Sequence, residues 1–182
     1  LFGQSQTSFS VDSAAVYLRT IAVDIGARPM GSANERAAME FALRKFREFG
    51  LSDAYIMPIM EYPGFRGSPP TNTRSGVAVG ILRGATSRII VLGAHIDSAD
   101  PSVPGANDDG SGSVAVIELS RVLSQRKNQS TIVFALFGGE DEDVIFADGV
   151  LGFDFDAEGV GASSLGRISH RCGGKRLNHW LW

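Results

Sequence analysis

The segment 93–113 concentrates side chains that can bind metal ions or transfer protons. It holds one histidine, one asparagine and four aspartates, and it follows the apolar run 88–94. Carboxylates packed this closely raise one another's pKa unless a cation neutralises them. The segment is therefore either a solvated acidic loop or a site for a positive ion, and imidazole combined with carboxylates suits zinc.

Within this segment, His95 and Asp97 are two residues apart. On an extended chain their side chains point the same way, so Asp97 can reach the imidazole and orient it. A packed histidine at a strand end is the alternative, but Asp97 and Asp108 downstream favour His95 as a metal ligand. The glycine-rich stretch around Asp108 lets that carboxylate turn inward, whereas Asp109 is expected to cap the following helix.

A second acidic cluster follows the apolar run 131–137. Glu140 and Asp141 come directly after Gly138 and Gly139, and two more acids stand beside them at Glu142 and Asp143. A solvated acidic loop is the alternative interpretation. The apolar strand before the cluster favours a site, in which one carboxylate binds metal and the other moves the proton of a water molecule.

The elements that position these clusters can be predicted from apolar spacing. Helices are expected over 11–23 and 34–49, the second capped by Asn34 and ended by Gly50, and a third after residue 111. The strand 88–94 barely alternates, which predicts burial on both faces, and the proline in 54–60 predicts an edge strand. Strand 88–94, the third helix and strand 131–137 form a βαβ unit. Its strands end at one edge of an α/β sheet, so both acidic clusters are expected in one cleft.

Composition sets further limits on function. The chain has 182 residues, a net charge of −3, and one cysteine, Cys172. The net charge favours neither nucleic acid nor an anionic membrane as a partner, and a single cysteine excludes an internal disulfide. The sequence has no apolar run long enough to span a membrane. The opening LFGQSQ is similar to the remnant of a cleaved signal peptide, which predicts a secreted or extracytoplasmic protein; a chain fragment is the alternative.

Three ordered motifs together resemble the zinc aminopeptidases of peptidase family M28. They are VLGAHIDS, PGANDDGSGS and TIVFALFGGED, and the upstream IGARPMGSANERAAMEFALRKFREFGL is also similar to the family's N-terminal region. The resemblance covers roughly residues 10–141. It implies a three-layer αβα fold with a mostly parallel, mixed central sheet.

The resemblance also implies roles for individual residues. His95 would bind one zinc ion with support from Asp97, and Asp108 would bridge two zinc ions. Glu140 would be the general base, and Asp141 would stand at a zinc-ligand position where the family usually has glutamate. Aspartate is one methylene shorter, so this ligand must reach further.

Downstream of Asp141 the sequence departs from the family pattern. Asp154, in GVLGFD, is the candidate for the next zinc ligand. The segment between Asp141 and Asp154 is, however, too short for the crossover helix that the family has there. His170 and His179 are the remaining histidines, and neither has a family-like context. We therefore expect one domain over residues 1–182 in which residues 142–182 are atypical and incomplete through truncation, deletion or a frame change.

The first functional hypothesis is a zinc-dependent exopeptidase that hydrolyses N-terminal peptide bonds of peptide substrates, with water activated between two zinc ions. Carboxypeptidases and glutaminyl cyclases share the family resemblance, so the reaction stays open. The alternative is a non-catalytic or truncated relative that binds one metal ion or none. A calcium site is a weaker third hypothesis, because the acidic loops lack EF-hand spacing. Oligomeric state is not predicted.

Overall fold

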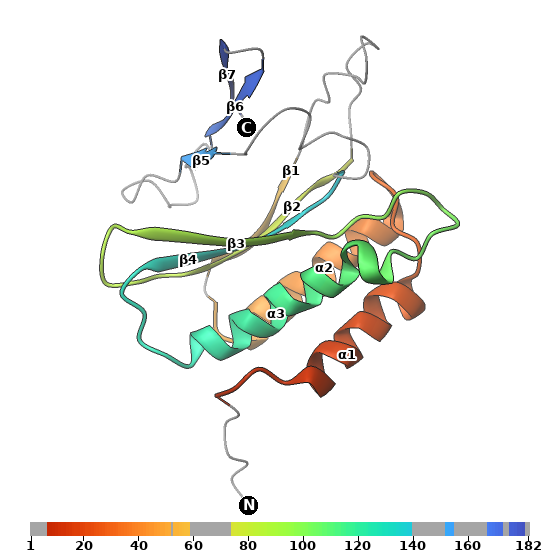
Figure 1. Ribbon diagram of the computed structural model, residues 1–182, viewed down its shortest axis with the longest axis horizontal. Helices are drawn as coiled ribbons and strands as arrows, with labels where there is room; N and C mark the ends of the chain where they lie inside the picture. The colour runs from red at the N-terminus through yellow and green to blue at the C-terminus, as the bar shows by residue number, and fades with distance from the viewer. Residues whose placement is uncertain are drawn as a thin grey trace, which may run out of the picture.

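The computed structural model describes residues 7–51, 53–58, 74–139, 152–154, 167–172 and 175–180. Its main sheet has the strand order β1-β2-β4-β3 and is flanked by helices (Figure 1). The helices are α1 (Val11–Arg19), α2 (Ala33–Glu48) and α3 (Ser111–Ser124), and the strands are β1 (Asp53–Pro58), β2 (Gly76–Leu82), β3 (Ile89–His95) and β4 (Thr131–Phe137). The predicted α/β class is confirmed.

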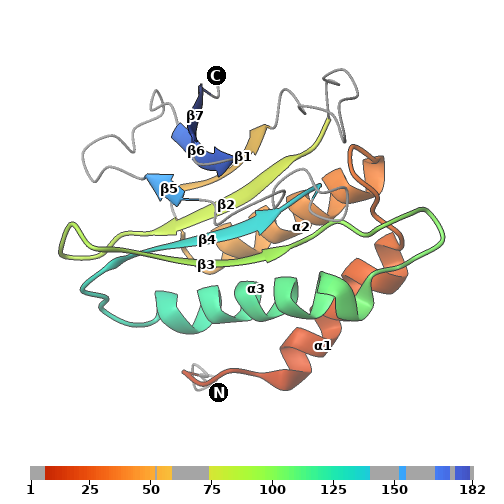
Figure 2. The ribbon, with the colours of Figure 1, turned by 45° about the horizontal axis from the view of Figure 1, so that its top comes forward.

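The sheet is mixed. Strand β4 pairs with β3 in parallel and with β2 in antiparallel orientation, and β1 pairs with β2 in antiparallel orientation. The predicted unit of β3, α3 and β4 is present, with α3 as its crossover (Figure 2). Consequently, the carboxyl ends of β3 and β4 lie side by side, with His95 in register with Phe137.

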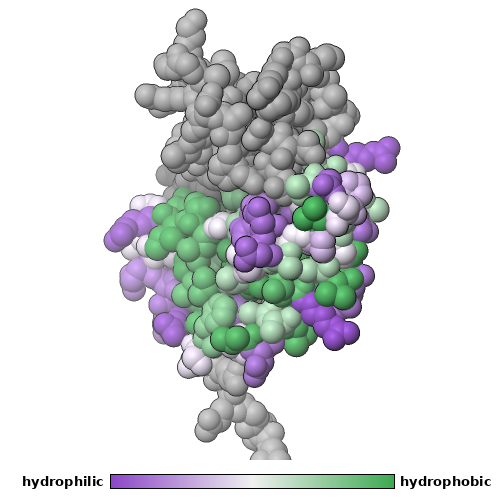
Figure 3. Space-filling view, turned by 45° about the vertical axis from the view of Figure 1, so that its right-hand side comes forward, coloured by the Kyte–Doolittle hydropathy of each residue, from purple (hydrophilic) through white to green (hydrophobic). Residues whose placement is uncertain are grey.

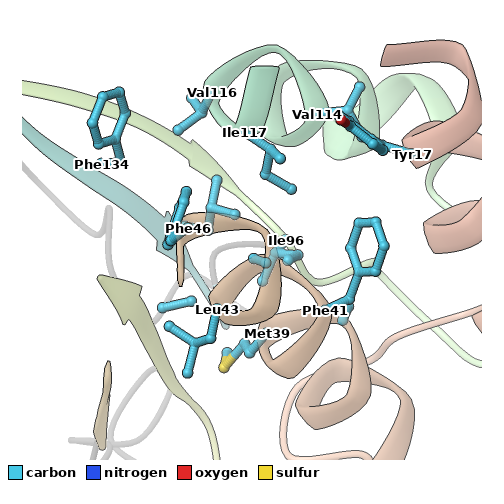
Figure 4. Close-up of a cluster of buried hydrophobic side chains, with 14 of the residues drawn as sticks. Tyr17, Met39, Phe41, Leu43, Phe46, Ile96, Val114, Val116, Ile117 and Phe134 are labelled. Carbon is cyan, nitrogen blue, oxygen red and sulfur yellow. The ribbon is translucent and has the colours of Figure 1, made fainter. Parts of the chain in front are cut away.

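The described helices cover one face of this sheet. Met39, Leu43 and Phe46 form the predicted apolar stripe of α2, and they are buried together with Ile117 of α3 and Phe134 of β4 (Figure 4). The rings of Phe46 and Phe134 lie 6.0 Å apart between their centroids. The alternate residues of β2 and β4 form a second cluster on the opposite face: Val77, Val79, Ile81, Val133, Ala135 and Phe137. Each face of the sheet thus has its own apolar core.

Gly80 explains how closely α2 approaches the sheet. A β-carbon at this position would lie 2.7 Å from Cδ2 of Phe46 and 2.9 Å from Cδ2 of Leu51. Since real β-carbons do not come so close to neighbouring atoms, only glycine allows the Phe46 ring to pack against the backbone of β2.

Two expectations about the helices need correction. Helix α2 is capped by Ser32, whose side chain accepts a hydrogen bond from the Glu35 amide, and not by Asn34. The Asn34 side chain instead donates to the carbonyls of Ile25 and Ala27. Ser32 is the capping residue because its hydroxyl lies three residues before the Glu35 amide, which has no partner inside the helix. The expected helix 11–23 ends as α1 at Arg19 and continues as a π-helical turn over Thr20–Ile25.

The predicted burial of β3 on both faces is wrong. Its Ile90 and Val91 side chains are 45% and 39% exposed. The reason is that β3 is the outer strand of the described sheet and pairs only with β4 there. Pro58, by contrast, closes β1 at the other edge, as a proline-containing edge strand was expected to do.

Apolar side chains also reach the surface on the N-terminal helix and the turn after it. Val11, Val16 and Val23 are 73%, 61% and 68% exposed. Figure 3 shows hydrophobic and hydrophilic residues mixed over the described part of the face that it presents. No helix in the described ranges is long and apolar enough to cross a membrane.

A second sheet has three strands in the order β5-β6-β7, all antiparallel. The strands are β5 (Gly152–Asp154), β6 (Arg167–Cys172) and β7 (Lys175–Trp180). The expected strand around GVLGFD therefore exists as β5, but it pairs with β6 and not with the main sheet. The expectation of one domain over residues 1–182, in which residues 142–182 are atypical, stays a prediction.

Candidate metal centre

His95 stands between two carboxylates at the end of β3. Its Nδ1 lies 3.3 Å from Oδ1 of Asp97, and its Nε2 lies 3.1 Å from Oδ1 of Asp108. The Asp97 side chain is fully buried, the His95 side chain is 10% exposed, and the Asp108 side chain is 80% exposed. The imidazole thus spans from a buried carboxylate to one that solvent reaches.

The two ring nitrogens of His95 face different carboxylates. A neutral imidazole donates through one nitrogen and accepts through the other. When Nδ1–H donates to the buried Asp97 carboxylate, Nε2 keeps its lone pair toward Asp108. A carboxylate behind the ring is the usual device that orients a histidine ligand and raises its basicity.

Backbone contacts hold His95 in place. The Ser113 hydroxyl, in the first turn of α3, donates a 2.7 Å hydrogen bond to the His95 carbonyl. The Ile96 amide donates to the Phe137 carbonyl at 2.6 Å, which extends the pairing of β3 and β4 beyond the last strand residue. Helix α3 and strand β4 therefore both position the residue that carries the imidazole.

Asp108 and Asp109 point to different neighbours although they are adjacent. Oδ1 of Asp109 accepts a 2.9 Å hydrogen bond from the Gly112 amide in the first turn of α3, as expected of a capping residue. Asp108 departs from helical backbone geometry within the turn Ala106–Gly110 and reaches His95. The contact expected of Asp109 at the helix start is present, whereas the metal-ligand role of Asp108 stays a prediction.

The other predicted site residues lie outside these contacts. Glu140 and Asp141 are outside the described residues, but Gly138 and Gly139 before them leave the same sheet edge as His95. Asp154 is the last residue of β5, and its backbone is in register with Arg167 of β6. The roles assigned to these three acids remain predictions.

Arg28 is a residue that the sequence did not single out. It is fully buried, and its guanidinium donates hydrogen bonds to five backbone carbonyls. Three of these carbonyls belong to the site loop, at Ile96, Pro104 and Gly105. The only signal in the sequence was ARPMG, residues 27–31 of the upstream stretch that resembles the family, and it does not indicate a buried charge.

Glu35 is the second residue that the sequence did not reveal. Its carboxylate is 1% exposed and accepts hydrogen bonds from the Ser75 hydroxyl at 2.6 Å and the Gly31 amide at 2.7 Å. Burial, with a smaller contribution from the charge of Asp97, raises the pKa of Glu35 to about 7, although these two hydrogen bonds lower it. A protonatable carboxyl thus sits near the buried aspartate of the site.

His95 and Asp108 present a donor set that suits zinc. Imidazole nitrogen and carboxylate oxygen are both common zinc ligands, and Nε2 and Oδ1 approach each other to 3.1 Å from separate elements. Within the described ranges no group of three or more candidate ligands is present. The described residues therefore supply two candidate ligands and one supporting carboxylate.

Comparison with known proteins shows which family this chain resembles. The sequence profile of peptidase family M28 matches residues 77–165, which include His95, Asp97 and Asp108. The resemblance to peptidase family M28 is confirmed.

Individual relatives agree with the M28 match. The chain is 37% identical over 82 residues to a probable zinc metalloprotease of Leptosphaeria maculans, covering 40% of this chain and 19% of that protein. It is 44% identical over 72 residues to leucine aminopeptidase 1 of Grosmannia clavigera, covering 33% and 18%. Porphyromonas gingivalis glutaminyl cyclase superposes with a TM-score of 0.61 at 28% identity, covering 73% of this chain and 46% of the cyclase. The chain thus spans about a fifth of these curated relatives and about half of the solved structure.

Proposed function

We propose that this chain carries the His95 and Asp108 part of the zinc centre of an exopeptidase that hydrolyses N-terminal peptide bonds. The observation that carries the proposal is the placement of His95 between the buried Asp97 and the exposed Asp108. The M28 match and the names of the relatives support zinc and a peptide substrate. We further propose that the full centre holds two zinc ions, with Asp108 shared between them and Asp141 and Asp154 as additional ligands.

The residues of the chain have separate duties in this proposal. Asp97 keeps Nδ1 of His95 protonated, so that Nε2 offers its lone pair. Asp108 contributes carboxylate oxygens from the opposite side. Zinc supplies Lewis acidity when bound, which polarises a carbonyl group and lowers the pKa of a water molecule. Glu140 takes up the proton of the attacking water on its carboxylate and delivers it to the departing amine.

The decisive experiment counts zinc and measures turnover on the 182-residue chain. Bound zinc is quantified by mass spectrometry, and hydrolysis of aminoacyl anilides is followed for the wild type and two variants. Glu140→Gln is expected to keep zinc and lose hydrolysis, whereas His95→Ala is expected to lose zinc. Glu142→Gln is the matched control, because it neutralises an acid of the same segment that has no assigned role.

The same assay separates the alternatives. Release of ammonia from peptides with N-terminal glutamine, without anilide hydrolysis, would replace the exopeptidase by a glutaminyl cyclase. The likeness to the Porphyromonas gingivalis enzyme is the reason to include that substrate. One zinc ion or none, with no turnover of either substrate, would replace both by a non-catalytic relative.

A further inference from the structure

Arg28 carries a buried positive charge beside the loop that holds His95, Asp97 and Asp108. Its side chain is fully buried, and its guanidinium donates to five main-chain oxygens. A guanidinium presents five N–H groups in a rigid fork, so it can hold several carbonyls in one fixed arrangement. Burying such a charge costs a large desolvation energy, which the hydrogen bonds must offset.

The carbonyls come from both ends of the loop that carries the site. Nε donates to Ile96, between His95 and Asp97, at 2.7 Å. The two terminal nitrogens donate to Pro104 at 2.7 Å and to Gly105 at 3.0 Å, just before the turn that contains Asp108. One planar group therefore holds the His95 end and the Asp108 end of the loop at a fixed separation.

The backbone of Arg28 adds a second attachment. Its amide donates to the Ser98 hydroxyl at 2.8 Å, and its carbonyl accepts from the Ser98 amide at 3.1 Å. Ser98 follows Asp97 directly and is 1% exposed. The residues on both sides of Asp97 are thus bound to Arg28, one to its side chain and one to its backbone.

The remaining bonds fix Arg28 itself. Its NH1 group also donates to Gly26 at 2.9 Å and to Ile21 at 3.2 Å. Gly105 in turn accepts from the Gly110 amide at 3.0 Å, which closes the turn that holds Asp108. Hydrogen bonds therefore join the guanidinium to Gly105 and Gly105 to Gly110, the residues that lie on either side of Asp108 in this turn.

We propose that Arg28 is a positioning residue that sets the distance between the imidazole of His95 and the carboxylate of Asp108, and thereby the affinity for zinc. These bonds end on backbone carbonyls of the loop and on the Ser98 hydroxyl, so Arg28 acts on the two ligands through the loop. Metal ligands must lie within narrow distances of the ion, and partners that only orient them typically contribute about 10- to 100-fold in affinity. This inference rests on the proposed zinc centre.

The test compares Arg28→Lys with Arg121→Lys in the full chain. Lysine keeps the charge but has no planar fork, so it cannot hold Ile96, Pro104 and Gly105 together. Arg121 is a matched control, because it also donates to a distant backbone carbonyl, at Ser8, but lies away from the site. Arg28→Lys is expected to weaken Zn²⁺ binding about 10- to 100-fold by calorimetry, and Arg121→Lys to leave it unchanged. Unchanged affinity in a folded Arg28→Lys protein overturns the proposal.

Ser98→Ala covers the case in which Arg28→Lys does not fold. It removes only the hydroxyl that accepts from the Arg28 amide and leaves the guanidinium bonds in place. A smaller loss of Zn²⁺ affinity, between the wild type and about 10-fold, is expected from this variant. An unchanged Zn²⁺ affinity in Ser98→Ala would contradict the positioning role of Arg28.

A metal-free measurement separates failure of this inference from failure of the proposed function. Nitrogen-15 resonances of His95 report Nδ1, which faces Asp97, and Nε2, which faces Asp108. Arg28→Lys, or Ser98→Ala if the lysine variant does not fold, is expected to move the Nε2 resonance more than the Nδ1 resonance. A wild-type chain that binds no Zn²⁺ refutes the zinc centre, while unmoved His95 resonances in the folded variant refute the positioning role.

Discussion

The carboxyl group of Glu35 occupies the space beside Gly138 in which a larger residue would place its β-carbon. A methyl group at Gly138 would collide with Oε1 of Glu35 and would approach Oγ of Ser75 to 2.5 Å. Gly138 is the first residue after β4, and its amide donates to the Gly76 carbonyl at 2.9 Å. The exit of the chain toward Glu140 therefore runs against a buried carboxyl of α2.

Gly138→Ala is expected to destabilise the protein by about 1–3 kcal/mol, because an extra methyl group in a filled site forces its neighbours apart. Urea unfolding measures this loss. The added variant Glu35→Ala tests the cause, since it removes the atom that the methyl group meets. The two changes together should then cost less than the sum of the single changes; simple additivity would show that the strain lies elsewhere.

The raised pKa of Glu35 predicts a stability that falls with pH. The folded chain holds this proton until about pH 7, whereas the unfolded chain releases it near the ordinary value of 4.5. Between these values the folded state binds more protons, so the free energy of unfolding decreases as the pH rises, by up to about 3 kcal/mol. Urea unfolding across this window checks the wild type against Glu35→Gln, which is expected to lose this slope. Equal slopes in both proteins would contradict the assignment.

Asp97→Asn is expected to weaken zinc binding about 10- to 100-fold without changing the number of sites, because it removes the charged partner of His95 Nδ1. Calorimetric titration measures both quantities. Asp100→Asn is the control in the same loop: Asp100 is exposed and accepts bonds from the Ser102 amide and hydroxyl. If both variants bind zinc equally, the buried carboxylate has no special role.

Arg121→Ala is expected to destabilise the protein by about 3 kcal/mol. The Glu118 carboxylate is fully buried and pairs with Arg121 through contacts of 2.6–3.1 Å, so removing the arginine leaves a buried charge without its cation. The exposed pair of Arg36 and Glu40 is the comparison, and Arg36→Ala should cost less than about 1 kcal/mol. Urea unfolding of both variants checks the difference; similar losses would show that burial does not decide it.

Much of the fold followed from apolar spacing. The stripe of Met39, Leu43 and Phe46 located α2, and the continuous apolar runs located β3 and β4, because burial needs these periods whatever the tertiary context. Edge position is different. The exposure of Ile90 and Val91 depends on which strands lie beside β3, and no local pattern contains that information.

The site was predictable where it depends on short separations. The contact of His95 with Asp97 follows from side-chain alternation along an extended segment, and the contact of Asp109 with Gly112 follows from helix capping. Arg28 was not predictable in this way. Arginine is almost always solvent-exposed, and its burial depends on carbonyls as far away as Gly105, which only the folded chain brings together.

Asp108 and Asp109, just before α3, restrict insertions and deletions in this part of the chain. The Asp109 side chain accepts a hydrogen bond from the Gly112 amide at the start of the helix, and the Asp108 side chain contacts His95. Consecutive residues therefore contact two different elements. Many substitutions at the exposed residues of the neighbouring loop would leave both ties intact. Inserting or deleting a single residue between Asp109 and Gly112 would instead force the chain to give up either the helix start or the imidazole contact. Here the spacing of the residues is constrained more tightly than the composition of the loop around them.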